Sequence, residues 1–192
     1  MQEHLFHIDT AVVTPHLVVR RFREREGEAF WELIQDNQSH IGDYLPELLE
    51  EIRAPDQAEG FVRRKLARWL QQQEFAFSIW ETDEAKPIGY LAFADFQPEL
   101  ESARLSGFLD RPYTGRGLMT EVVVYMLPFA FRQLRLQRLY ALTYADHYAA
   151  QRLARKCGFH REGDLRQALR RPTGDYSDAT LFAITRQEYL KT

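Results

Sequence analysis

The chain has 192 residues, of which 45% are hydrophobic and 28% charged, and its net charge is −3 at pH 7. This length suits one domain with one core, and the composition excludes a disordered tail and a strongly basic nucleic-acid-binding protein. A single cysteine, Cys157, excludes an internal disulfide, and no run approaches the roughly 20 apolar residues that span a bilayer. The start lacks the pattern of a secretion signal. We therefore expect one cytoplasmic domain over residues 1–192, with an N-terminal extension at 1–14 and with neither DNA nor a membrane as partner.

The first part of the chain predicts one strand, three helices and three strands. In order, these elements are a strand at 17–22, helices at 26–39, 45–52 and 55–72, and strands at 75–80, 88–96 and 103–110. The helices carry apolar residues three or four positions apart, whereas the strands are rich in aromatic and β-branched residues. A turn at 83–87 joins the second and third strands. Gly107 lies inside the last strand, which indicates a bulge or a close backbone approach.

The second part predicts two helices and three strands. These are a helix at 118–134, a strand at 138–143, a helix at 148–156, a strand from 159 onwards and a strand at 176–185. Pro128 should kink the first of these helices because it removes one backbone hydrogen bond. The whole order predicts a mixed α/β (α+β) sheet flanked by helices.

The most informative pattern is the stretch 107–121, where a strand runs into a glycine turn at 115–117 and a helix follows at once. Such a turn leaves backbone N–H groups unpaired beside the positive end of a helix dipole, and this suits a phosphate or pyrophosphate. Glycine also avoids a Cβ that would block the approach of phosphate oxygens. A Walker loop is excluded because Leu118 follows Gly117, and a dinucleotide fingerprint because Thr120 occupies the place of its third glycine.

On these residues the chain resembles the GNAT acetyltransferase superfamily and, within it, the bacterial ribosomal-protein N-acetyltransferases of RimJ/RimL type. The phosphate motif of that family, Q/R-x-x-G-x-G/A, falls on residues 114–119, where Gly117 is kept while Thr114 and Met119 depart from it. The opening L-x-L-R resembles residues 17–20, and a late G-x-Y/W-x-D turn resembles residues 174–178.

A second signature of the family, N-x-x-S/A-x-x-x-x-x-K-x-G-F, resembles residues 147–159. Lys156, Gly158 and Phe159 match it, and His147 replaces the asparagine. The resemblance therefore extends over nearly the whole chain.

The resemblance implies a GNAT fold, a mixed and mostly antiparallel sheet of about six to seven strands that splays open at an acetyl-CoA site. Acetyl-CoA is then a co-substrate, no metal is expected, and a backbone N–H near Gly107 polarises the thioester carbonyl. The cofactor-binding residues that it implies are Phe108, Leu109, Asp110, Thr114, Gly115, Arg116, Gly117, Leu118, Met119, Thr120, His147 and Lys156.

The same resemblance implies direct attack of a neutral amine on the thioester. The candidate bases are Glu99, Glu101 and Glu121, although carboxylates at such positions are more often solvated surface groups. Many relatives protonate the leaving thiolate with a tyrosine or a serine on the second-signature helix, and this chain has Ala154 and Ala150 at those positions. The nearest substitutes are Tyr148 and His147, with ring packing and a helix-start role as the alternatives. The catalytic candidates are thus Tyr148, His147 and Glu101.

The resemblance also implies that the acceptor binds at the first helices and the late turn, with Trp31, Tyr44, Leu45 and Tyr176 as candidate binding residues. The acidic stretch 43–51 favours a cationic acceptor. Three functions stay open: an enzyme acetylating a protein N-terminus such as that of a ribosomal protein, an enzyme acetylating a small amine (a polyamine, antibiotic or peptide toxin), and a non-catalytic acyl-CoA sensor. The resemblance also admits a homodimer.

Overall fold

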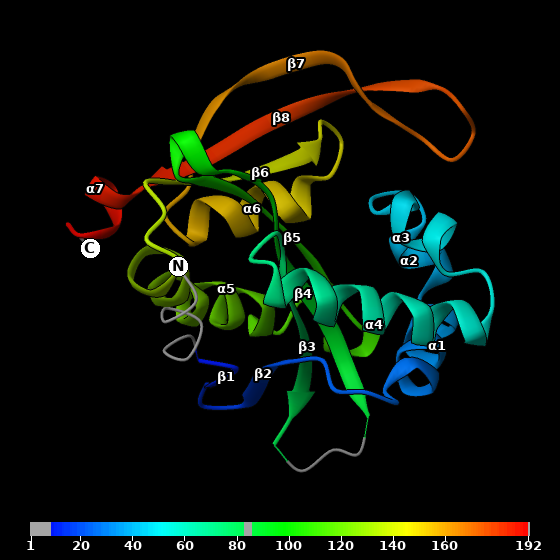
Figure 1. The fold of residues 1–192 in the computed structure, drawn as a ribbon. Helices are drawn as coiled ribbons and strands as arrows, with labels where there is room; N and C mark the ends of the chain where they lie inside the picture. The colour runs from blue at the N-terminus through cyan, green and yellow to red at the C-terminus, as the bar shows by residue number, and fades with distance from the viewer. Residues whose placement is uncertain (1–8, 83–85, 192) are drawn as a thin grey trace.

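The structure, a computed structural model, describes residues 9–82 and 86–191, and an eight-stranded sheet forms the centre of this part of the chain (Figure 1). Its strands are β1 (Ala11–Val13), β2 (Leu17–Arg21), β3 (Phe75–Glu81), β4 (Pro87–Gln97), β5 (Ser102–Leu109), β6 (Arg138–Tyr144), β7 (His160–Arg170) and β8 (Tyr176–Thr185). The helices are α1 (Gly27–Asp36), α2 (Gln38–Ile41), α3 (Pro46–Glu51), α4 (Pro55–Leu70), α5 (Leu118–Pro128), α6 (Tyr148–Lys156) and α7 (Arg186–Tyr189), with shorter helical turns η2 (Pro98–Leu100), η3 (Arg111–Tyr113) and η4 (Phe129–Gln133).

The strands lie in the order β1-β2-β3-β4-β5-β6-β8-β7, and every neighbouring pair is antiparallel except β5 and β6. The parallel pair is short, because its pairing runs only from Ser102 opposite Arg138 to Arg104 opposite Tyr140. On its other edge, β5 stays paired with β4 as far as Leu109. The sheet therefore opens between β5 and β6, which confirms the expected mixed, splayed sheet.

The strand count of six to seven was too low. Ala11–Val13, inside the stretch expected to be an extension, pairs with β2 as an edge strand. Three residues of alternating exposure are too short for a periodic signal, so the pattern could not separate them from a tail. Residues 1–8 and most of the turn at 83–87 lie outside the described residues.

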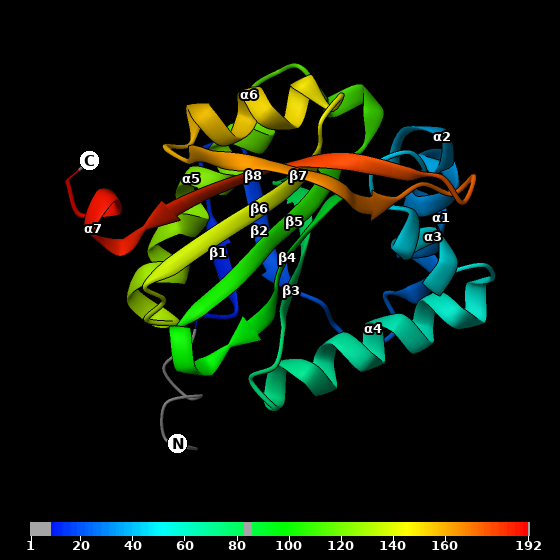
Figure 2. The ribbon, with the colours of Figure 1, turned by 90° about the horizontal axis from the view of Figure 1, so that it is seen from above.

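Helices cover both faces of the sheet (Figure 2). α5 and α6 pack on one face, over alternate strand residues such as Leu91 and Phe93. α1 to α4 pack on the other face, over Tyr90, Ala92 and Phe108. Each fully buried large side chain contributes about 1.5–3 kcal/mol, so the alternation along β4 and β5 fixes which face each strand residue presents.

The helix expected at 26–39 breaks at Asn37, which is buried. Its Nδ2 donates to the Leu33 carbonyl at 2.9 Å and to Asp110 Oδ1 at 2.8 Å, and its Oδ1 accepts from the Arg111 N–H at 2.9 Å. This one side chain therefore joins the end of α1 to the segment that follows β5.

The helix expected at 118–134 is two pieces, α5 and the π-helical turn η4. The change comes directly after Pro128, which cannot donate to the preceding turn, and the Leu134 N–H bonds to the Phe129 carbonyl five residues back. Within residues 9–82 and 86–191, no helix has the length and apolar character needed to cross a membrane.

Candidate functional site

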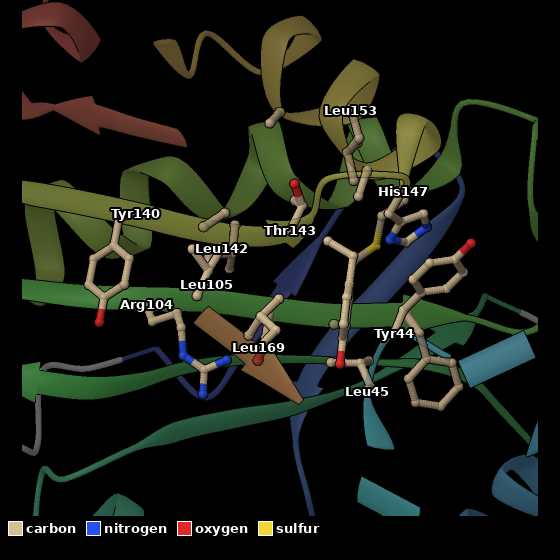
Figure 3. Close-up of a pocket in the computed structure, with 18 of the residues that line it drawn as sticks. Tyr44, Leu45, Arg104, Leu105, Tyr140, Leu142, Thr143, His147, Leu153 and Leu169 are labelled. Carbon is tan, nitrogen blue, oxygen red and sulfur yellow. The ribbon is translucent and has the colours of Figure 1, made fainter. Parts of the chain in front are cut away.

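A cavity of about 550 Å³ lies where β5 and β6 separate (Figure 3). It is lined by residues of both strands and by side chains from both layers of helices. Because no β5–β6 hydrogen bonds close the sheet beyond Arg104 and Tyr140, the cavity passes from one face of the sheet to the other. A ligand entering from one face can therefore meet a second ligand entering from the opposite face.

The wall on the α5–α6 face is apolar. It consists of Met119 and Val123 of α5, Ala150, Leu153 and Ala154 of α6, and Cys157 and Phe159 beyond it. Burial raises the pKa of the Cys157 thiol to about 11, so the thiol keeps its proton at neutral pH and is a poor nucleophile. Cys157 therefore acts as a small packing residue of this wall.

The wall on the opposite face is aromatic and polar. Tyr44, Leu45 and Glu47 reach it from the segment that carries α2 and α3, while Tyr140 and Tyr144 reach it from β6. Burial raises the pKa of both β6 tyrosines, so both keep their protons at neutral pH. The Tyr144 hydroxyl donates to the Arg170 carbonyl at 2.8 Å and thereby fixes the start of the β7–β8 connection over the cavity.

His147 lies at one end of the cavity and stacks on Tyr44, with ring centroids 3.6 Å apart and planes 11° from parallel (Figure 3). Burial lowers its pKa to about 4, and the neighbouring His40 acts in the same direction. The imidazole is therefore uncharged at neutral pH. It can form hydrogen bonds in this form, but it is a poor general acid because very little of it is protonated.

The glycine turn lies at the start of α5. Gly115 and Gly117 have φ values of +74° and +83°, and no atom lies within 4 Å of a Cβ built on either. Their left-handed backbone is thus a second reason for glycine, besides the room that a phosphate needs. Because Gly117 precedes the first turn of α5, the free N–H groups of that turn face the same open space.

Gly107 serves a different purpose. A Cβ on it would lie 2.4 Å from the Tyr90 carbonyl oxygen and 3.0 Å from Met119 Cε. The expected close backbone approach is therefore present, and it lies between β5 and β4.

The cavity brings together only part of the predicted residue set. The predicted residues that line it are Tyr44, Leu45, Phe108, Met119 and His147. Those that belong to the segment leading into α5, or to α5 and α6, without lining it are Leu109, Asp110, Thr114, Gly115, Arg116, Gly117, Leu118, Thr120 and Lys156. Tyr148, the first residue of α6, does not line it either, and Trp31, Glu101 and Tyr176 lie elsewhere in the fold.

Two catalytic candidates are placed away from the cavity. Tyr148 is 65% exposed, and Glu101 occupies a left-handed turn before β5, where its carbonyl accepts from the Gln137 N–H. Of the other candidate bases, Glu121 accepts from Thr14 Oγ1 at 2.5 Å and pairs with His16 at 2.8 Å. Burial acts to raise the pKa of Glu121, but these hydrogen bonds outweigh it and leave that pKa lowered. Glu121 thus anchors the β1–β2 turn to α5.

Three charged residues that line the cavity were not predicted as site residues: Asp95, Arg104 and Arg170. Glu47 also lines it and belongs to the acidic stretch 43–51 that was expected near the acceptor. Arg104 carried a usable signal, because it is the one basic residue in the predicted strand 103–110. In the described part of the chain, no group of three or more His, Cys, Asp or Glu side chains could hold a metal ion.

Comparison with known proteins gives consistent matches. The protein-family model described as an acetyltransferase (GNAT) domain matches residues 16–160 of this chain. "Probable N-acetyltransferase YjcK" of Bacillus subtilis (strain 168) is 30% identical over 154 residues, which cover 77% of this chain and 83% of that protein. RimL, a ribosomal L7/L12 alpha-N-protein acetyltransferase solved with coenzyme A, has a TM-score of 0.84 at 20% identity, over 91% of this chain and 97% of that one. The microcin C7 self-immunity acetyltransferase MccE, solved with acetyl-CoA and AMP, has a TM-score of 0.78 at 17% identity, over 89% and 93%.

Proposed function

This chain belongs to the GNAT acetyltransferase family, and from that premise we propose that it transfers the acetyl group of acetyl-CoA directly to the α-amine at a protein N-terminus. The observation that carries the proposal is the cavity that passes through the sheet between β5 and β6. It allows a thioester held from the α5–α6 face to meet an amine that enters from the opposite face. The chain is an N-acetyltransferase of GNAT type, and the α-amine acceptor is the proposed refinement.

Two features support acetyl-CoA on the α5–α6 face. The open turn at 115–117 and the first N–H groups of α5 suit the pyrophosphate. From Leu105 to Leu109, β5 is paired with β4 only, so its other backbone edge is free to pair with the amide groups of the pantetheine arm. The apolar wall at Leu153 and Ala154 then suits the acetyl end.

The chemistry of the cavity favours an acceptor that needs little help with deprotonation. An α-amine, with a pKa of about 7.7–8.0, costs about 1 kcal/mol to deprotonate at pH 7, whereas a lysine near 10.4 costs about 4–5 kcal/mol. Glu47 lines the acceptor side and forms no hydrogen bond or ion pair with any described residue. We assign it the role of accepting the amine proton through water.

The absence of a proton donor at Ala150 and Ala154 is compatible with turnover. A thiolate with a pKa of about 8.5 leaves at neutral pH at a cost of about 2 kcal/mol relative to the thiol, which water can then protonate. The α6 wall can therefore stay apolar without preventing the reaction.

Thiol release from acetyl-CoA tests the proposal. Release should depend on a peptide with a free N-terminus, and Glu47→Gln should lower kcat by about tenfold or more with a smaller effect on the KM for acetyl-CoA. Binding of acetyl-CoA without amine-dependent release, measured by calorimetry on the same preparation, would contradict the enzyme and indicate the sensor. Faster release with spermidine than with any peptide would indicate a small-amine enzyme.

A further inference from the structure

Arg104 is the one arginine of β5, and it points to the acceptor side of the sheet. Its neighbour Ala103 is buried on the α5–α6 face, so the alternation along the strand directs Arg104 to the other face, as it does Phe108. The side chain lines the cavity and is 27% exposed. Figure 3 shows it beside Tyr140, at the end of the cavity away from His147 and Tyr44.

A strained bulge holds this arginine in place. The β4–β5 register shifts between Ala94 and Gln97, and Asp95 within the bulge has a φ of +51°. Asp95 Oδ2 accepts a hydrogen bond from Arg104 Nε at 2.5 Å. A left-handed non-glycine residue costs of order 1–3 kcal/mol and is retained where the surroundings require it, and bulges beside active sites often re-aim one side chain.

The hydrogen bond to Nε leaves the far edge of the guanidinium unused. Neither terminal amino group of Arg104 donates to another residue of the described chain, while Nε is held by Asp95. A planar pair of N–H donors in a fixed orientation matches the two oxygens of a carboxylate. The Asp95 carboxylate is 53% exposed, so much of its charge is screened by solvent.

The charges facing Arg104 also limit what can bind. Asp95 and Glu47 both raise the pKa of Arg104, although burial alone would lower it, so it stays charged at every physiological pH. A permanent cation here repels a second ammonium group, while the unpaired Glu47 attracts the reacting one. The cavity therefore suits an acceptor with one ammonium and one carboxylate better than a polyamine. This differs from the cationic preference expected from the stretch 43–51, in which Glu51 is paired with Arg64.

From these contacts we infer that Arg104 is a specificity-determining residue that binds a carboxylate of the acceptor close to its reacting amine. This inference rests on the proposed function. It predicts that the preferred acceptors are peptides whose N-terminal residue is followed directly by an acidic residue. Asp95 acts as a positioning residue that holds the guanidinium in its binding orientation.

The test uses two acetylation acceptors, Ser-Glu-Ala-Ala-amide and Ser-Gln-Ala-Ala-amide, with the full chain and acetyl-CoA. The wild type should acetylate the Glu peptide with a kcat/KM about tenfold or more above that of the Gln peptide, a ratio typical of one charge-assisted hydrogen-bonded pair. Arg104→Gln should bring this ratio close to one, Arg104→Glu should bring it below one because two carboxylates repel each other, and Asp95→Asn should reduce it in part. Arg63→Gln, an exposed arginine on α4, is the matched control and should keep the wild-type ratio.

A ratio near one in the wild type, or a ratio that survives Arg104→Gln, overturns the inference. A merely structural role of Arg104 would lower both rates together and leave the ratio intact. The Glu-to-Gln ratio is also measured with two further peptides, N-acetylated Lys-Glu and N-acetylated Lys-Gln, whose free amine is the lysine side chain. If only these are acetylated, the α-amine proposal fails, and the Glu-to-Gln ratio on the lysine peptides still decides the role of Arg104.

Discussion

The ring of His147 stacks on the ring of Tyr44 with their centroids 3.6 Å apart, and this contact joins the start of α6 to the segment between α2 and α3 across one end of the cavity. The contact keeps the imidazole out of water and therefore lowers its pKa to about 4. A neutral histidine thus links the two helix layers at this end of the cavity.

The half-buried imidazole of His147 predicts a dependence of stability on pH. A histidine with a folded pKa below its usual 6.5 favours the neutral form, so its contribution to stability is complete above about pH 6.5 and is lost as the pH falls towards 4. His147→Phe keeps a ring against Tyr44 and removes this titration. Urea unfolding at several pH values should give a shallower loss of stability between pH 6.5 and 4 in His147→Phe than in the wild type. Tyr148→Phe, an exposed neighbour, is the control, and equal slopes in His147→Phe and the wild type would contradict the buried neutral state.

Two glycine-to-alanine changes should have opposite effects on stability. Gly107→Ala puts a Cβ 2.4 Å from the Tyr90 carbonyl and should lower the free energy of unfolding by about 1–3 kcal/mol, because β5 must move away from β4. Gly60→Ala, inside α4 with its nearest atom at 3.4 Å, should raise that free energy by about 0.5–1 kcal/mol. Urea midpoints measure both, and a neutral Gly107→Ala would show that the β4–β5 approach is not tight.

The turn at the start of α5 should control acetyl-CoA affinity rather than folding. Gly117→Ala adds a Cβ to a residue with a φ of +83° where nothing crowds it, so strain of about 1–2 kcal/mol can relax by a local shift of the turn. We expect acetyl-CoA to bind about tenfold more weakly by calorimetry, while the thermal midpoint changes little. Gly163→Ala in β7, also uncrowded but without a positive φ, should bind as the wild type does. Unchanged affinity in a folded Gly117→Ala would contradict the pyrophosphate assignment.

The sequence predicted the fold where regular periodicity decides the structure. The strand 176–185 and the helix 148–156 have the predicted bounds, because their apolar residues repeat clearly. Tertiary contacts decided the rest. The break at Asn37 depends on Asp110 and Arg111, and the bulge at Asp95 depends on Arg104, so neither has a local pattern.

The sequence predicted the position of the glycine turn before α5, but only part of the cavity lining. The motif placed the turn because its backbone requirement is local, whereas the acceptor wall is assembled from distant elements. One error could have been avoided. Ala150, Leu153, Ala154 and Cys157 have helical spacing and line the cavity, so Tyr148 belongs to another face of α6.

The most direct test of the central claim is the position of the acetyl group on matched peptides. One peptide has a free N-terminus and blocked lysines, and the other has an acetylated N-terminus and free lysines. With its pKa about 2.5 units lower, the α-amine should be acetylated with a kcat/KM at least about tenfold higher at pH 7, with the product located by mass spectrometry. Faster acetylation of the lysine peptide, or of free spermidine over both, would contradict an N-terminal acetyltransferase.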